Sequence, residues 1–168
     1  MAGTSMVTVT GLEKVISNMN KEVIKMRGKT FAGLIDAAII VKRDVDKGNP
    51  KTPVKDRNIQ HSLFITTATM TDKGGRGFSG DDSGKLTTEH SQTTEEAKTF
   101  VQQQRQPTLI MGYTAFYAMA VHEMGYGPKT AGKTIKWSRP GSGAKWFEES
   151  LNRNRGAILA TIAKHAKI

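Results

Sequence analysis

The sequence predicts one α+β domain, with helices at both ends of the chain packed on an antiparallel sheet of about four strands joined by long loops. Two observations predict this class. Apolar residues recur at three- and four-residue steps near both termini, and β-branched residues alternate with other residues in the middle. The chain has 168 residues, of which 37% are hydrophobic, and this suits a single core. We therefore expect residues 1–168 to form one domain, with residues 1–10 as an N-terminal arm.

The first expected helix follows that arm. Its apolar stripe consists of Leu12, Val15, Ile16, Met19, Val23 and Met26. A second stripe keeps the same period over residues 31–45, until the Gly-Asn-Pro sequence at 48–50 ends it. Because Gly28 and Gly33 interrupt the pattern, it predicts either one bent helix or a pair of helices.

Four segments in the middle of the chain favour strands. In Ile59–Ala68 alternate residues lie on one side of an extended chain, and β-branched residues are enriched. The other candidates are residues 98–104, 107–114 and 133–137. Residues 71–97 are polar and rich in glycine, so they predict a long loop, as do residues 125–143.

Two further elements complete the expected fold. Tyr117–Gly125 favours a short amphipathic helix that ends at Gly125, although alternating residues also permit a strand. A C-terminal helix from Ala144 follows a flexible lead-in at residues 140–143 and carries the aromatic pair Trp146 and Phe147 near its start.

The residues with reactive side chains do not form a recognisable catalytic pattern. The chain has no cysteine, which excludes disulfides, thiolate metal sites and cysteine nucleophiles. His122-Glu123 lacks the second histidine that a zinc protease places three residues after the glutamate, where Tyr126 stands. Ser62 next to His61 has no nucleophile elbow around it. We therefore expect no enzyme activity, metal or cofactor.

The charge of the chain points to acidic partners. The formal net charge is +10, and residues 128–168 carry nine lysines and arginines against two glutamates. Residues 71–97 have the opposite balance, with six acidic and three basic side chains. Such asymmetry suits head-to-tail pairing of like subunits. For the basic C-terminal helix, a solvated face and a docking face are both open readings.

The glycine-rich run at residues 73–80 also has two readings. Arg76 and Phe78 could contact a single nucleic-acid strand, although one aromatic ring in a net acidic loop is a weak platform for bases. The default reading is a flexible interface loop. No apolar run is long enough for a membrane helix, and the N-terminus lacks the layout of a signal peptide. We expect a protein made in the cytoplasm of its host cell.

Several short motifs, in order along most of the chain, resemble a known family. They are Thr52-Pro53, Asn58 and Ser62 around the first strand, then Tyr117-Ala118, Val121, Glu123 and Gly125, and finally Trp146-Phe147 before the last helix. This order resembles the tail-completion, or head-to-tail joining, proteins of long-tailed bacteriophages. The chain departs from the family pattern at residues 55–58, where Lys-Asp-Arg-Asn replaces an Asp-Thr-Gly turn.

The resemblance implies a structural protein of the virion neck. Such a subunit would form a ring, expected to be hexameric, between the portal-side connector proteins and the tail terminator or tail tube, with DNA passing through its bore without sequence readout. It would not contact a membrane. The expected interface residues are Arg76, Phe78, Tyr117, Glu123, Tyr126, Trp137, Trp146 and Phe147. A basic nucleic-acid-binding module without catalytic activity is the alternative function.

Overall fold

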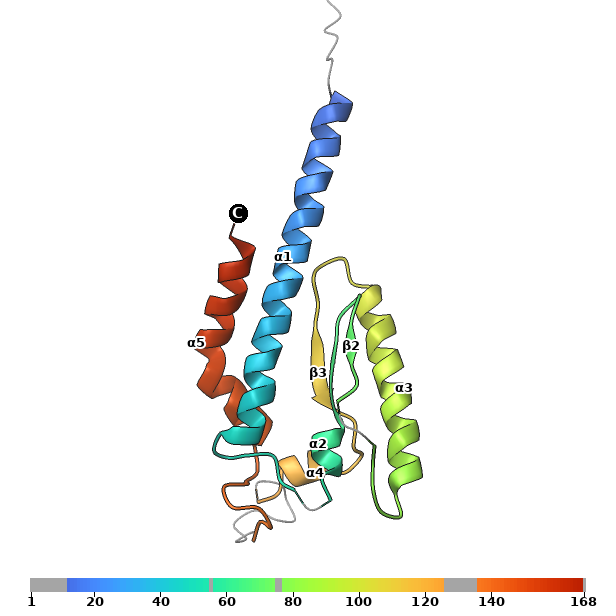
Figure 1. Ribbon diagram of the computed structural model, residues 1–168, viewed down its shortest axis with the longest axis vertical. Coiled ribbons are helices and arrows are strands. Elements are labelled where there is room, and N and C mark those ends of the chain that lie inside the picture. The colour runs from blue at the N-terminus through green and yellow to red at the C-terminus, as the bar shows by residue number, and fades with distance from the viewer. Residues whose placement is uncertain (1–11, 55, 75–76, 126–135, 168) are drawn as a thin grey trace, which may run out of the picture.

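The computed structural model describes residues 12–54, 56–74, 77–125 and 136–167 (Figure 1). The expected arm at residues 1–10 lies outside this part of the chain. The elements are helices α1 (Leu12–Lys47), α2 (Asn58–His61), α3 (Ser83–Gln102), α4 (Ala118–His122) and α5 (Trp146–Ala166), and strands β1 (Leu63–Thr66), β2 (Thr71–Asp72) and β3 (Ile110–Tyr113). The predicted mixture of terminal helices and an antiparallel sheet is confirmed.

The helices flank the sheet on two sides. Figure 1 shows α5 beside the C-terminal part of α1 on one side, and the sheet followed by α3 on the other. Helices α1 and α5 run in opposite directions, because α5 starts near the C-terminal end of α1 and climbs back along it. The described helices include none that is long and apolar enough to cross a membrane.

The N-terminal stripes belong to one continuous helix, which decides the alternative left open by the two glycines. Gly28 has no neighbouring atoms within 4 Å of the place where a Cβ would stand, so the helix passes through it in open space. Gly33 allows close packing instead. A Cβ there would lie 3.0 Å from His165 Cβ and 3.1 Å from Ile162 Cα, so the absence of a side chain lets α5 approach α1.

The sheet has three antiparallel strands in the order β2-β1-β3, so the expectation of four strands is wrong. β1 is shorter than the predicted segment because residues 58–61 form the helical turn α2 before it. β3 lies within predicted segment 107–114 and pairs Leu63 with Tyr113 and Ile65 with Met111. Of the candidate at 133–137, the described residues Lys136 and Trp137 are not in a strand, and the others lie outside the described chain.

Helix α3 corrects two predictions at once. Most of the expected loop at 71–97, and the expected strand at 98–104, belong to this helix. Its buried residues are Leu86, His90, Thr94 and Val101, which recur with helical spacing. Because two of these four side chains are polar, an apolar stripe was not visible in the sequence. The threonine hydroxyls are satisfied within the helix, as where Thr94 donates to the His90 carbonyl at 2.7 Å.

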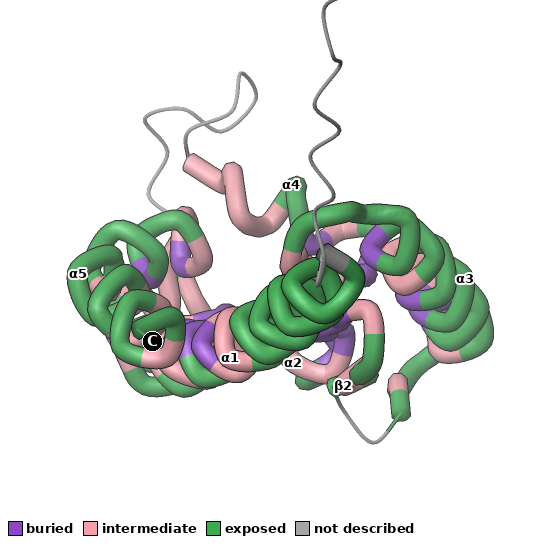
Figure 2. Tube along the Cα trace, turned by 90° about the horizontal axis from the view of Figure 1, so that it is seen from above, coloured by how far each residue is buried: buried purple, intermediate pink, exposed green. Residues whose placement is uncertain are grey.

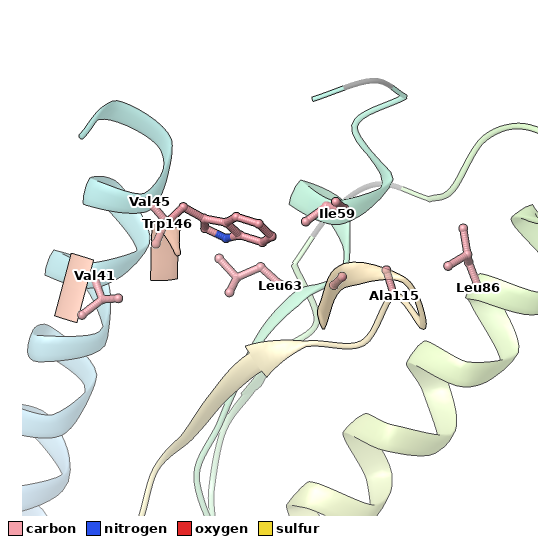
Figure 3. Close-up of a cluster of buried hydrophobic side chains, with 8 residues drawn as sticks. Val41, Val45, Ile59, Leu63, Leu86, Ala115 and Trp146 are labelled. Carbon is pink, nitrogen blue, oxygen red and sulfur yellow. The ribbon is translucent and has the colours of Figure 1, made fainter. Parts of the chain in front are cut away.

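The hydrophobic core lies low on α1 and between the two helical layers. Figure 3 shows side chains from α1, α2, β1, α3 and α5 converging there, and the cluster comprises Val41, Val45, Ile59, Leu63, Leu86, Ala115, Ala118 and Trp146. Figure 2 shows the other end of α1 exposed all round. The packed body therefore uses only the C-terminal part of its longest helix.

Candidate functional site

The junction between α4 and α5 gathers more of the predicted site residues than any other described region. Lys145, the residue before α5, adopts a left-handed conformation with φ of 58°. Its backbone N–H donates to the His122 carbonyl at 2.8 Å, which ties the end of α4 to the start of α5. This turn brings His122 and Glu123, at the end of α4, next to the aromatic pair of α5, although Trp146 comes 24 positions after His122 in the chain.

A pocket of about 300 Å³ opens at this junction. Its walls come from β3, α4 and α5 and are mostly apolar. The lining residues are Gly112, Tyr113, Ala118, Met119, His122, Glu123, Trp146 and Phe147. Among its lining residues Met119 is 77% exposed, the highest value of the large apolar side chains in the described chain.

The polar side chains of the pocket bind one another. Glu123 accepts a hydrogen bond from Lys145 Nζ at 2.7 Å, and His122 Nδ1 lies 2.8 Å from its other oxygen. Lys145 also pairs with Glu148 at 3.1 Å. The hydrogen bond from Lys145, followed by that from His122, lowers the pKa of the Glu123 carboxyl. The same contact raises the pKa of Lys145. Both groups therefore stay charged around neutral pH and hold the junction together.

His122 is oriented for packing rather than for proton transfer. Its ring meets Trp146 edge to face, with ring centroids 4.8 Å apart. Its Nε2 atom is buried and, within the described residues, has no hydrogen-bond partner. A general base must reach the proton that it removes, and this nitrogen exposes almost no surface in the present arrangement. The His122–Glu123 pair thus resembles a histidine and its orienting carboxylate, but without an accessible reacting atom.

Tyr113 closes the inner side of the pocket. Its ring meets Trp146 and Phe147 edge to face at 5.9 and 5.8 Å, and its hydroxyl lies 3.2 Å from that of Thr52. Burial raises the pKa of Tyr113 to about 12. The phenol therefore remains neutral at physiological pH, and it acts as a packed, hydrogen-bonded wall.

The other histidines are separately engaged. His90 lies between the Lys73 carbonyl and the Thr114 hydroxyl, each 2.7 Å from one ring nitrogen. Since a carbonyl only accepts, Nε2 donates to Lys73, and burial lowers the His90 pKa. His61 lies 2.6 Å from the Gly77 carbonyl, and His165 lies 2.8 Å from Asp36. In the described chain, no three histidine or acidic side chains gather in a way that could hold a metal ion.

The predicted interface residues have different environments. Trp146 is 1% exposed and fills the core, so the prediction that it anchors a subunit contact is wrong for this residue. Phe78 and Tyr117 are half-buried and pack against the same core, Phe78 with its ring edge-on to His90 at 5.5 Å. Phe147 is half-buried at the pocket, as is Glu123.

The remaining predicted residues lie in the segments between elements. Trp137 is half-buried in a stretch without regular structure, and Arg76 and Tyr126 lie outside the described residues. The expected loop at 125–143 is also described only from residue 136 onward, where Lys51 and Ser142 form an isolated parallel bridge. The prediction of interaction loops is therefore untested for most of this segment.

The sequence did not reveal two features of this region. Phe116 is 48% exposed, and the Lys85 ammonium lies 3.8 Å from its ring centroid. Lys145 was not singled out, because nothing in the glycine-rich lead-in at residues 140–143 shows that the Lys145 side chain turns back to Glu123.

Comparison with protein-family models, with curated proteins and with solved structures finds no match to this chain.

Proposed function

We propose that the protein is a structural subunit of a bacteriophage neck, which assembles as a ring between the head connector and the tail and lets DNA pass through its bore. The proposal starts from the family resemblance of the motifs around Thr52, Tyr117 and Trp146. One observation carries it further. The charged groups of the pocket between α4 and α5, Glu123 and Lys145, are bound to each other, whereas its lining includes an exposed large apolar side chain, Met119. Such a surface suits a protein partner better than a reacting substrate.

The distribution of charge supports a head-to-tail contact between copies. Residues 81–102, which include α3, carry five acidic and two basic side chains, whereas residues 146–167, which include α5, carry four basic and two acidic ones. Figure 2 shows these two helices at opposite sides of the molecule. An acidic side and a basic side on the same subunit can pair repeatedly in one direction, and a ring results where the rotation closes.

The test is electron microscopy of virions or isolated tails that carry the tagged chain, together with native mass spectrometry of the purified protein. We expect labelled density as a ring at the neck, and an assembly of several copies in solution. Met119→Glu should prevent ring assembly while the fold is retained, and Ile24→Glu, an exposed apolar residue far from the pocket, is the control. Label found only in the capsid interior or only outside virions would contradict the proposal.

A nucleic-acid-binding module is the second candidate, favoured by the net charge of +10. It predicts that the isolated chain binds duplex DNA with a dissociation constant that rises steeply with salt concentration. The neck protein predicts weak binding without sequence preference. A salt titration of binding to a labelled duplex separates the two, because tight binding at physiological salt by a monomer would favour the module.

A further inference from the structure

The N-terminal half of α1 extends beyond the rest of the molecule with an apolar face uncovered. We call residues 12–28 the projecting segment. Its large apolar side chains are exposed to between 37% and 69%, namely Val15, Ile16, Met19, Val23, Ile24 and Met26. Figure 1 shows that α5 ends well below the start of α1, and Figure 2 shows the projecting segment exposed on every side.

Two contacts show that α5 covers α1 only from about residue 29 onward. Lys29 Nζ donates to the Lys167 carbonyl at 3.3 Å, and Gly33 packs against His165 and Ile162. One turn closer to the N-terminus, Gly28 has no neighbour within 4 Å. The projecting segment is therefore about 25 Å of helix that no other described element supports. Helices of this length are marginal in water on their own, so an apolar face along one of them indicates a missing partner.

The spacing of this face is that of a coiled-coil seam. Ile16, Met19, Val23 and Met26 follow one another at steps of three, four and three residues. Their positions correspond to a and d of a heptad, whereas Ile24 falls on the outer position b. The same spacing leads on to Gly33 and Ala37, which face α5. The seam is thus one continuous face of α1, of which α5 covers only the C-terminal part.

We propose that a second copy of this chain covers the seam, with the two projecting segments packed antiparallel. Direction follows from the fold. In a parallel pair the partner helix would continue alongside α1 past residue 30 and enter the space that α5 occupies. In an antiparallel pair the partner's projecting segment would lie beyond the C-terminal end of α5. It would continue the line of α5 and run in the same direction as α5. Each molecule would then repeat, between copies, the antiparallel packing of α1 on α5 within one chain.

The antiparallel register pairs the seam residues fully. Ile16 of one copy packs against Met26 of the other, and Met19 packs against Val23. The overlap ends near residue 30, where α5 begins to cover the seam. A twofold axis then passes close to residue 21, which makes the contact isologous.

Charges beside the seam are compatible with this register. Glu13 of one copy falls opposite Arg27 of the other, twice in the dimer. The Glu22 carboxylates of the two copies would lie close to each other at the twofold axis and repel each other. Lys25, 3.6 Å from the Glu22 carboxylate in the same chain, reduces this repulsion. The predicted contact is separate from the head-to-tail contact proposed above and does not rest on it.

Cysteine cross-linking tests both the partner and the direction, because the natural chain has no cysteine. Under mild oxidation, Ile16→Cys/Met26→Cys should give a covalent dimer on a non-reducing gel. Ile16→Cys alone should form no covalent dimer and should run as a single chain. A disulfide within one chain is excluded, since these positions lie about 15 Å apart along a helix. Cross-linking of the single variant would indicate a parallel pair, and no cross-linking of the double variant would exclude the contact. Either result overturns the proposal.

Mass measurement over a range of protein concentrations tests the contact without oxidation. The full-length chain carrying Met119→Glu, which blocks only the proposed ring contact, should have twice the mass of one chain at high concentration. Adding Met19→Glu should abolish the dimer, whereas adding Ile24→Glu should not. Arg27→Glu should raise the dimer dissociation constant about tenfold, and Glu13→Arg/Arg27→Glu should restore it. A Met119→Glu chain that remains monomeric at every concentration would overturn the proposal, even if the natural chain forms rings.

Discussion

The two halves of α1 both carry an apolar side, but only the C-terminal half has that side covered by other elements of the described chain. In residues 33–47 the apolar side is enclosed, with Val41 3% and Val45 1% exposed. In residues 12–28 an equally regular apolar side stands in solvent, with Met19 63% exposed. The spacing of apolar residues therefore predicts a helix and shows which side of it is apolar, but it does not show what packs against that side. One half is completed by the chain itself, and the other requires a second molecule.

The largest effect should come from removing the anchor of the covered half. Trp146→Ala deletes a side chain that contacts Tyr113 and His122 and is 1% exposed. We expect the free energy of unfolding to fall by about 3 to 5 kcal/mol. Val15→Ala in the projecting segment should change it by less than about 0.5 kcal/mol in the monomer. Denaturant titrations at low protein concentration measure both, and comparable losses would contradict the division of α1 into two regions.

The two helical glycines should respond in opposite directions to the same substitution. Gly33→Ala places a Cβ 3.0 Å from His165 Cβ and 3.1 Å from the Ile162 backbone. We expect a net loss of about 1 to 2 kcal/mol, because overpacking exceeds the gain in helix propensity. Gly28→Ala meets no atom and should stabilise the helix by about 0.5 to 1 kcal/mol. Thermal melts and far-UV circular dichroism distinguish the two, and equal effects would contradict this packing.

A smaller difference in stability is expected between two ion pairs, one in each half of α1. Arg153 binds the Asp44 carboxylate at 2.5 Å. Burial alone would raise the pKa of Asp44, but the hydrogen bonds to this carboxylate, of which that from Arg153 is the strongest, lower the pKa by more than burial raises it. Because the unfolded chain binds protons more readily, this stabilisation is present above pH 3.8, the ordinary pKa of Asp44, and is lost as pH falls below it. Arg153→Ala should cost about 1 kcal/mol at pH 7, given its partial exposure.

The corresponding pair in the projecting segment is more open. Lys25 and Glu22 lie 3.6 Å apart with both side chains 59% exposed. Lys25→Ala should therefore leave monomer stability nearly unchanged at any pH. Unfolding curves recorded between pH 3 and 7 compare the two variants. A pH-independent difference between Arg153→Ala and the natural chain would show that Asp44 is not the group that Arg153 stabilises.

The sequence was informative where burial follows apolar periodicity. α1 and α5 could be predicted because their stripes are apolar, and β3 could be predicted within a few residues. α3 could not, because the polar residues His90 and Thr94 occupy half of its buried stripe. Thr94 bonds within the helix, but His90 bonds to Lys73 and Thr114, which are distant in the chain. In the candidate site, large aromatics were predicted as interface anchors. Trp146 fills the core instead, since the turn at Lys145 directs it inward, and this turn depends on a contact 23 residues away at His122.

Amide hydrogen exchange along α1 at two protein concentrations tests the central claim most directly. Amides of residues 33–47 should be protected at both concentrations, because the body of the subunit encloses them. Amides of residues 12–28 should exchange rapidly in dilute solution and become protected when copies associate. Rapid exchange of residues 12–28 at every concentration, or protection already complete in the monomer, would contradict the account.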